Sequence, residues 1–265
     1  METTASATKP VGDLLREWRQ SRRMSQLDFA GDAEISTRHL SFLETGRSQP
    51  SREMILRLAE RLDIPLRERN LLLVAAGYAP LFPERKLDDP TLAPQRRAVE
   101  IVLKGHEPFP ALAIDRHWTM IAANGAVRPL LAGVTAELLQ PPVNVLRLSL
   151  HPNGLAPRIE NLSEWCTHLF DRLRRQIDLT ADPTLITLLE ELRGYPSPPG
   201  ARKNPAADYA GVVVPLRLRT DAGTLSFFST TTVFGTPVDI MLSELAIESF
   251  FPADADTVEF LRKLG

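Results

Sequence analysis

The sequence has one cysteine, few aromatic residues and no long apolar run. The single thiol, Cys166, excludes a disulfide within the chain and a zinc site built from cysteines, and it is typical of a reducing compartment. No apolar stretch approaches the roughly 18 to 20 residues of a membrane-spanning helix, and the start METTASATKP lacks the charged and apolar regions of a signal peptide. We therefore expect a cytoplasmic protein that does not contact a membrane.

The residue patterns that an enzyme would need are also missing. The histidines, at positions 39, 106, 117, 151 and 168, form neither an HxH nor an HExxH arrangement, so a histidine-cluster metal site has no support. The sequence contains no GxSxG motif and no glycine-rich phosphate loop. Self-cleavage at Ala76-Gly77, as in phage-type repressors, lacks a serine and lysine pair that can be placed. We expect no catalytic residues, no metal and no cofactor other than a bound ligand.

Excess charge of one sign is absent as well, since the net charge is -2 over 265 residues. Residues 1–79 carry 12 Lys and Arg against 11 Asp and Glu, and residues 80–265 carry 19 against 22. Neither part is basic enough to indicate nucleic-acid binding by charge alone. With 43% hydrophobic and 24% charged residues, the composition is that of a globular protein, and the length favours two domains.

Proline indicates where the two domains meet. Six prolines lie between positions 80 and 110 and four between 196 and 205, so helices and central strands should not run through either stretch. We predict a disordered tail at residues 1–10, an all-α DNA-binding domain at 11–79, a linker at 80–94 and an α+β domain at 95–265.

Residues 11–76 have the apolar spacing of about five short helices. Ser25 and Ser36 are suitable N-caps, Gly46 follows the third helix and Pro65 precedes the fifth. The expected helices are Val11–Arg22, Ser25–Gly31, Ser36–Glu44, Arg52–Leu62 and Leu66–Ala76.

The second and third of these helices have the spacing of a helix-turn-helix. Only residues 32–35 join them, so the helices must cross steeply and the outer face of the third must stay exposed. The polar, small and apolar anchor positions of the motif are filled by Gln26, Ala30, Leu40 and Leu43. The side chains left pointing outward, where such a helix enters the major groove, are Thr37, Arg38, Ser41 and Phe42.

We predict that this exposed helix and its flanks bind double-stranded DNA. Arg38 can bind a guanine edge through two hydrogen bonds, and Thr37 can contact a thymine methyl group. The full set of predicted DNA contacts, including phosphate contacts at the flanks, is Gln26, Thr37, Arg38, His39, Ser41, Phe42, Arg47 and Ser48. One helix reads only a few base pairs, so we expect a homodimer. The alternative is a helical bundle whose arginines only keep it soluble.

The segment MSQLDFAGDAEISTRHLSFLETGRSQPSREMILRLAERLDIP resembles the XRE-type helix-turn-helix family, which includes Cro and the phage repressors. In this family an arginine of the first helix pairs with the glutamate that ends the recognition helix, and the matching residues are Arg19 and Glu44. The turn position usually taken by glycine is Glu34. A residue other than glycine in a left-handed conformation there would cost on the order of 1 kcal/mol.

The second domain begins with PALAIDRHWTMIAANGAVRPLL, which predicts two strands joined at 115–117 and a helix capped by Asn124. PAS-type sensor domains begin in this way. Further helices are expected at Val143–Leu150, Arg158–Asp178 and Asp182–Arg193, and further strands at Val212–Thr220, Thr224–Phe234 and Val238–Ile247. In the long helix, the side chains on or near the polar side are Arg172, Arg174 and Arg175. Four to five antiparallel strands with helices on one face would leave a cavity between the layers.

Candidate ligand-binding residues fall into two groups. Large apolar side chains that could line such a cavity are Phe109, Trp118, Trp165, Leu169, Phe228 and Phe234. Among polar residues, Arg147 and His151 lie one helical turn apart and could clamp a carboxylate, and the set is completed by Asn124 and Thr232. The aromatic residues could equally be plain core, Arg147 a partner of a surface acid and His151 a helix cap.

Three segments resemble the MmyB-like transcription regulators: RHLSFLETGRSQPSREMILRLAERLDIPLRERNLLLVAAGYAP, NVLRLSLHPNGLAPRIENLSEW and LSFFSTTTVFGTPVDIMLSELAIESFFPADA. The resemblance extends from about Val11 to Ala255. It implies a one-component regulator that binds a DNA operator and carries a PAS-like domain for a small-molecule effector, which in this family is fatty-acid-like. The alternative is a second domain that serves only dimerisation or docks a protein partner.

Overall fold

The computed structural model describes residues 9–180, 182–196, 214–221, 223–235 and 239–264. The predicted tail therefore lies outside the described residues, apart from Lys9 and Pro10. The chain forms two compact units; the first ends at Arg85, within the expected linker, and also includes the short helix α10 (Ile240–Ser243). No helix in the described ranges combines the length and apolar character needed to cross a membrane.

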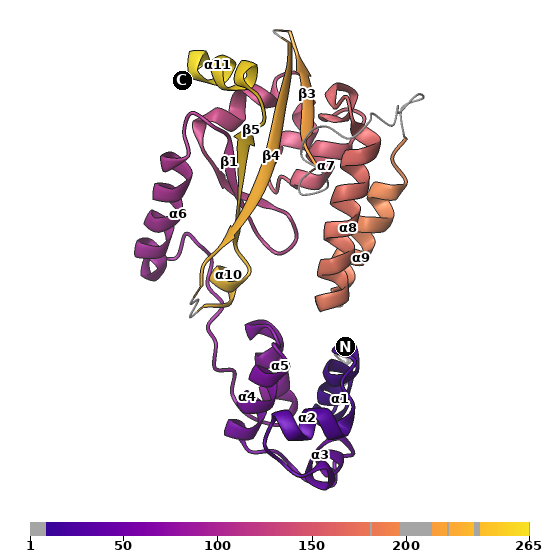
Figure 1. Ribbon diagram of the computed structural model, residues 1–265. Helices are drawn as coiled ribbons and strands as arrows, with labels where there is room; N and C mark the ends of the chain where they lie inside the picture. Colours follow the sequence, from indigo (N-terminus) through magenta and orange to yellow (C-terminus); the bar gives the residue numbers. More distant parts are fainter. Residues whose placement is uncertain (1–8, 181, 197–213, 222, 236–238, 265) are drawn as a thin grey trace, which may run out of the picture. The chain divides into compact units, whose positions relative to one another are not determined.

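The N-terminal unit contains the five predicted helices, with ends within two residues of those expected (Figure 1). They are α1 (Val11–Ser21), α2 (Gln26–Asp32), α3 (Thr37–Glu44), α4 (Arg52–Arg61) and α5 (Leu66–Ala75). Both predicted caps form: Ser25 Oγ accepts from Asp28 N at 3.1 Å, and Ser36 Oγ accepts from His39 N at 3.1 Å. Each cap satisfies a backbone donor that the helix itself leaves unpaired.

Tight packing of α1 against the end of α3 organises this unit. A Cβ atom on Gly12 would lie 2.4 Å from the carbonyl oxygen of Leu43, so only glycine permits this approach. Leu40 and Leu43 are buried in the same core as Phe29. The two anchors predicted beneath the third helix are therefore in place, and they fix which face of α3 remains outside.

The C-terminal unit is built on an antiparallel sheet of five strands in the order β2-β1-β5-β4-β3. The strands are β1 (Ala111–Ile114), β2 (Met120–Ala123), β3 (Leu216–Thr220), β4 (Gly223–Val233) and β5 (Ala246–Pro252). Alternate residues of a strand point to opposite faces. The register pairs Thr231 with Glu248 and Ser229 with Phe250, so these side chains share one face.

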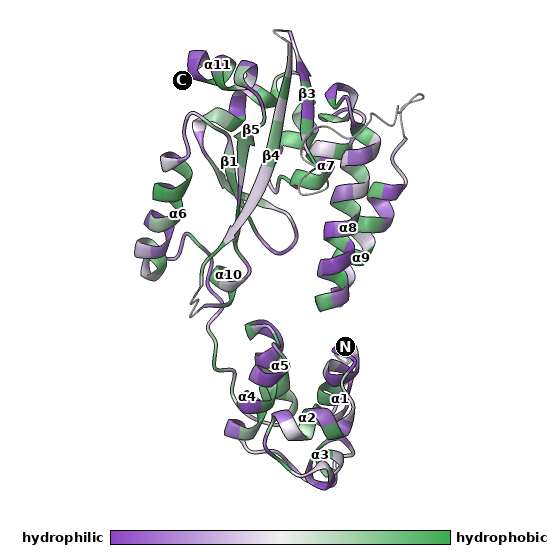
Figure 2. Cartoon of the chain, in the orientation of Figure 1, coloured by the Kyte–Doolittle hydropathy of each residue, from purple (hydrophilic) through white to green (hydrophobic). Residues whose placement is uncertain are grey.

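Helices and short 3-10 turns surround this sheet. The α-helices are α6 (Ala93–Gly105), α7 (Val145–Leu150), α8 (Leu162–Thr180), α9 (Pro183–Arg193) and α11 (Ala255–Leu264). The 3-10 segments are Pro90–Leu92, Gly125–Leu131, Ala136–Leu139 and Ala156–Arg158. In Figure 1, α8 and α9 lie side by side on one side of the sheet and α6 lies on the other. Hydrophobic and hydrophilic residues alternate along α8 and α9 in Figure 2, as expected for amphipathic helices.

Several sequence predictions for this unit are wrong. The helix expected after Asn124 is a 3-10 segment without a side-chain cap, because the Asn124 amide is buried and bonds Ala111 N, Leu103 O and Phe109 O instead. Helix α6 runs through the proline-rich stretch, which is possible because Pro94 occupies its first turn and no proline follows before position 108.

The last predicted strand also differs from the structure. Most of Val238–Ile247 forms α10 and the connection after it, and β5 begins at Ala246. Val238 itself, like Val212 and Val213 of an earlier predicted strand, lies outside the described residues. An apolar run of this length fits a buried helix as well as a strand, so its hydropathy alone misplaced the start of the central strand β5.

Candidate functional sites: a recognition helix and an apolar cavity

Helix α3 presents a polar and aromatic face away from the core of its unit. Thr37, Ser41 and Phe42 are half-buried and Arg38 is exposed, whereas Leu40 and Leu43 are buried. Thr37 and Ser41, like Arg38 and Phe42, are four positions apart and therefore lie one above the other on the helix. The side chains predicted to contact base edges therefore lie together on one surface.

Two arginines are held over one aromatic ring on this surface. The Cζ atoms of Arg38 and Arg47 lie 5.3 Å and 5.8 Å from the ring centroid of Phe42. The backbone strengthens the arrangement, because the amides of Arg47 and Ser48 both donate to the carbonyl of Phe42. Cation–π contacts of this kind limit the positions available to a guanidinium group. Phe42 thus orients the two flanking charges.

The ion pair implied by the family resemblance is present beneath the recognition helix. Arg19 Nε and Nη2 donate to Glu44 Oε1 and Oε2 at 2.7 Å and 2.9 Å, and both side chains are buried. Gln26 Nε2 donates to the same carboxylate at 2.8 Å. Burial raises the pKa of Glu44, but the hydrogen bonds from Arg19 and Gln26 outweigh it and leave the pKa below its usual value. The predicted phosphate contact Gln26 therefore also supports α3 from within.

The remaining predicted DNA contacts flank this face. His39 is half-buried, and its backbone amide takes part in the N-cap of α3. Ser48 is half-buried and Arg47 exposed, both in the segment that follows Gly46. Gly46 has a φ of +71°, a conformation that glycine adopts at little cost. The turn after α3 thus keeps both residues beside the exposed face.

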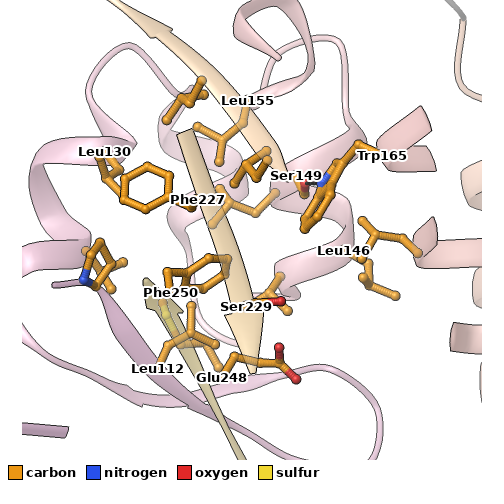
Figure 3. Close-up of a pocket in the computed structure, with 18 of the residues that line it drawn as sticks. Leu112, Leu130, Leu146, Ser149, Leu155, Trp165, Phe227, Ser229, Glu248 and Phe250 are labelled. Carbon is orange, nitrogen blue, oxygen red and sulfur yellow. Dashed lines mark hydrogen bonds between the residues drawn. The ribbon is translucent and has the colours of Figure 1, made fainter. Parts of the chain in front are cut away.

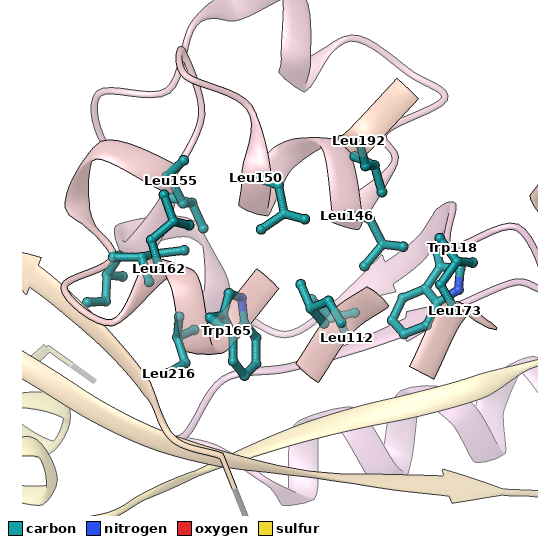
Figure 4. Close-up of a cluster of buried hydrophobic side chains, with 14 of the residues drawn as sticks. Leu112, Trp118, Leu146, Leu150, Leu155, Leu162, Trp165, Leu173, Leu192 and Leu216 are labelled. Carbon is teal, nitrogen blue, oxygen red and sulfur yellow. The ribbon is translucent and has the colours of Figure 1, made fainter. Parts of the chain in front are cut away.

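The C-terminal unit contains a cavity of about 100 Å³ between the sheet and helices α7 and α8. Figure 3 shows side chains from β1, β4, β5 and the helices pointing into it. The labelled lining residues are Leu112, Leu130, Leu146, Ser149, Leu155, Trp165, Phe227, Ser229, Glu248 and Phe250. The wall is almost entirely apolar and belongs to the main hydrophobic core of the unit (Figure 4). An apolar space of this size accepts a group of the order of a benzene ring.

Of the ten predicted ligand-binding residues, Trp118, Trp165 and Leu169 line this cavity. Phe228 does not, because the alternation of β4 places its neighbour Phe227 on the cavity face. Phe228 instead stacks on Phe251, with ring centroids 5.3 Å apart. Thr232 is exposed, and Phe234 lies beyond the end of β4.

The predicted carboxylate clamp lies outside the cavity. Arg147 Nε and Nη2 donate to the Glu191 carboxylate at 2.8 Å and 2.7 Å, so its charge is matched by an acid at the surface. His151 Nδ1 accepts from Asn153 N, and its ring packs against Tyr195. Burial, followed by the hydrogen bond to Glu191, raises the pKa of Tyr195 to about 12. These contacts are those of the structural alternatives, but Arg147 also lines a second, more polar pocket of about 490 Å³, so its ligand-binding role stays a prediction.

The other predicted ligand residues also have structural partners. Phe109 packs at the edge of the core and makes an edge contact with His106. The buried Asn124 joins the end of α6 to the start of β1. Neither is part of the cavity lining. Among the described residues, no group of three or more His, Cys, Asp or Glu side chains is placed to hold a metal ion.

The sequence reasoning missed two charged residues in the cavity wall, Arg172 and Glu248. Arg172 was placed on or near the polar side of its helix, yet it follows Trp165 and Leu169 on the inner side of α8. Its position three residues after Leu169 was the available signal. Glu248 lies in β5, beyond the strand that was expected to end at Ile247. In the segment AIESFF, Glu248 alternates with Ala246 and Phe250 and so shares a strand face with two apolar residues. That pattern was the available signal that this acid is buried.

Two family models match the chain. The MmyB-like transcription regulator ligand binding domain matches residues 95–264. A helix-turn-helix model matches residues 15–69. The first match covers the cavity and the second covers α3.

Relatives with curated descriptions share the helix-turn-helix character. The chain is 35% identical over 125 residues to a protein of Methanoculleus marisnigri described as an HTH-type transcriptional regulatory protein, a match that covers 45% of this chain and 40% of that protein. Transcriptional regulator ClgR of Mycobacterium tuberculosis is 34% identical over 67 residues, which are 25% of this chain and 57% of that protein. The chain thus covers less than two thirds of both relatives.

A further relative matches over most of its own length, whereas a solved structure is only weakly similar. HTH-type transcriptional regulator DdrOP3 of Deinococcus deserti is 34% identical over 105 residues, 36% of this chain and 81% of that protein. A solved RNA-binding light-oxygen-voltage receptor aligns with 98% of this chain and 65% of its own, at a TM-score of 0.26 and 11% identity. A likeness that weak carries no argument about fold or ligand.

Proposed function

This chain belongs to the MmyB-like transcription regulators and is a DNA-binding regulator with a ligand-binding domain, and from that premise we propose that its cavity binds a small apolar or fatty-acid-like effector. Binding of the effector changes the affinity of the helix-turn-helix for its operator. Such coupling requires that the effector bind more tightly to one of the two functional states. The protein acts in the cytoplasm as a homodimer and catalyses no reaction.

The observation that carries the effector proposal is the apolar cavity in the core of the second unit. Protein interiors are packed to the density of organic crystals, and voids cost stability because the wall atoms lose contacts. A ligand that fills the space recovers these contacts. We assign Trp118, Trp165 and Leu169 to the ligand-contacting wall, since all three line the cavity.

The DNA-binding proposal rests on the exposed face of α3. Arg38 and Thr37 read base edges, and Ser41 and Phe42 complete the surface that enters the major groove. Phosphate and flanking contacts come from Gln26, His39, Arg47 and Ser48. Two copies of α3, one from each subunit, read two half-sites about one helical turn apart.

Native mass spectrometry and thermal unfolding test the effector proposal. Protein purified without added lipid should carry an apolar adduct or gain thermal stability when a lipid and metabolite library is added. Leu130→Trp should abolish the adduct, because Leu130 is a half-buried residue of the cavity wall and the larger ring fills the space. Leu179→Trp is the matched control, since Leu179 is 54% exposed on α8.

The same experiment separates the two candidate roles of the second domain. If no compound binds and the protein is nevertheless a dimer by analytical ultracentrifugation, the domain serves dimerisation or partner docking. If binding occurs and Leu130→Trp removes it while Leu179→Trp does not, the domain is a sensor. Operator affinity measured with and without the bound compound then gives the sign of regulation.

A further inference from the structure

One end of the apolar cavity carries an ion pair. Of the described residues that line the cavity, Arg172 and Glu248 are the only ones with charged side chains. Arg172 Nη2 lies 2.5 Å from Glu248 Oε1, and Nη1 lies 3.2 Å from Oε2. The charges therefore cancel within the wall itself.

The guanidinium group of Arg172 is held in place from several sides. Its Cζ atom lies 4.8 Å from the ring centroid of Trp118, and Nη2 also donates to Thr231 Oγ1 at 3.0 Å. Trp118 Nε1 in turn donates to Gln176 Oε1 at 2.9 Å. Trp118 has a φ of +65°, a conformation that a bulky residue adopts only when its surroundings enforce it. Arg172 is thus directed toward Glu248.

Glu248 lies on the central strand and has almost no access to water. It is 4% exposed, and the register places it between Leu112 of β1 and Thr231 of β4. Thr231 Oγ1 donates to Glu248 Oε1 at 2.8 Å. A buried carboxylate that loses its cationic partner is strongly destabilising, so Arg172 cannot leave Glu248 for a ligand without a large cost.

This pairing restricts the head group of a ligand. A carboxylate would have to compete with Glu248 for Arg172, or lie beside a second negative charge in an apolar wall. An uncharged head group meets no such penalty, and the cavity wall offers serine hydroxyl groups that can form hydrogen bonds with it. Ser229 lies on the cavity face next to Glu248 in Figure 3, and Ser149 Oγ accepts from Trp165 Nε1 at 3.0 Å, which leaves its own proton to donate.

We propose that the cavity selects ligands with an uncharged polar head, such as an alcohol or a primary amide on an apolar chain, and rejects the corresponding carboxylates. Glu248 is the specificity-determining residue, because it neutralises the one cation that could bind an acid. The inference rests on the proposed effector role of the same cavity. It narrows that role by separating neutral lipids from free fatty acids.

Straight-chain alcohols, carboxylates and primary amides from butyl to decyl, matched in chain length, test the selection, and the shorter members match the size of the cavity. Binding to the full chain is measured by thermal shift and by the fluorescence of Trp118 and Trp165, both of which line the cavity. The alcohols and amides should bind at least about tenfold more tightly than the carboxylates. Equal or tighter binding of the carboxylates overturns the head-group inference but supports an effector cavity. If no series binds, the effector proposal falls with it.

A single substitution should reverse the preference. Glu248→Gln keeps the size of the side chain and leaves Arg172 unmatched, so carboxylates should gain at least about tenfold in affinity while alcohols change by less than about threefold. Glu84→Gln is the matched control, because Glu84 pairs with Arg67 in the same two-point manner but in the N-terminal unit. It should leave the ranking unchanged. Tighter carboxylate binding by both variants, or by neither, contradicts the assignment to Glu248.

A double variant keeps the test decisive if Glu248→Gln does not fold. Arg172→Gln combined with Glu248→Gln removes both charges together and leaves no unpaired ion in the wall. It should retain the wild-type preference for alcohols over carboxylates. Loss of that preference in a variant with native thermal unfolding would show that another feature of the cavity sets the selection.

Discussion

Arg19 and Glu44 form a buried, two-point ion pair that joins α1 to the last residue of α3. The contact is 25 positions apart in the sequence and lies directly beneath the exposed face of the recognition helix. Gln26 of α2 donates to the same carboxylate. One acid therefore connects the three helices that set the angle of the recognition helix.

Removing the arginine should destabilise the N-terminal unit strongly. Arg19→Ala leaves Glu44 buried without its cation, which costs about 3 to 5 kcal/mol. Hydrogen exchange resolved to α1 and α3, together with urea unfolding of the full chain, measures this loss. Arg61→Ala is the control, because Arg61 is exposed on α4 and its loss should change stability by less than about 0.5 kcal/mol. Equal effects of the two substitutions would refute a stabilising pair.

The same pair predicts an acid dependence of stability. The pKa of Glu44 is lower in the folded protein than its usual value, since the hydrogen bonds from Arg19 and Gln26 outweigh the effect of burial. Its carboxylate therefore stabilises the fold above the unfolded pKa, and this contribution is lost as the pH falls through the folded pKa. The stability difference between wild type and Glu44→Gln should be largest near neutral pH and shrink in acid. A difference that stays constant across the titration is incompatible with this account.

Glycine in the turn of the helix-turn-helix should stabilise the protein. Glu34 has a φ of +55°, a left-handed conformation that glycine adopts without strain. Glu34→Gly should therefore raise the free energy of unfolding by up to about 1 kcal/mol. Asp32→Gly is the control in the same turn region, because Asp32 ends α2 and glycine there should destabilise. Chemical unfolding of both variants decides between strain relief and a general loosening of the turn.

Arg38 should contribute to sequence specificity, and Phe42 should contribute indirectly by orienting Arg38. Duplexes selected from a random library by the wild-type protein provide the binding sites. Arg38→Ala should cost roughly 1 to 3 kcal/mol and relax the preference at one base position. Phe42→Leu keeps an apolar contact but removes the ring that orients Arg38 and Arg47. It should therefore weaken the preference at the same base position by less than Arg38→Ala does. Unchanged sequence preference in Arg38→Ala would remove its assigned role.

The helix-turn-helix was predictable because its signals are local. Ser25 and Ser36 cap the helices within one turn of their own positions, and the apolar spacing of Leu40 and Leu43 places the core side of α3. The left-handed turn at Glu34 was also visible as a departure from the family pattern. These features depend on residues a few positions apart, which a sequence displays directly.

The cavity was predictable only in outline. Two adjacent aromatics, Phe227 and Phe228, have the same hydropathy, and only the strand register and the helix above the sheet decide which one faces the cavity. The choice of Phe228 was therefore wrong for the cavity wall. Arg147 and His151 had suitable spacing for a clamp, but Glu191 and Tyr195 from more distant parts of the chain occupy them.

By itself, the sequence determined an antiparallel sheet domain after a helix-turn-helix, and the exposed face of α3, because caps and periodic burial act over single helical turns or strand pairs. Only the tertiary structure decided that Arg172 and Glu248 meet in the cavity wall, 76 positions apart in the sequence. A charged residue is usually at the surface, so each of the two by itself predicts exposure. In the fold Glu248 is buried and Arg172 half-buried, and pairing is the condition under which their charges are tolerated there.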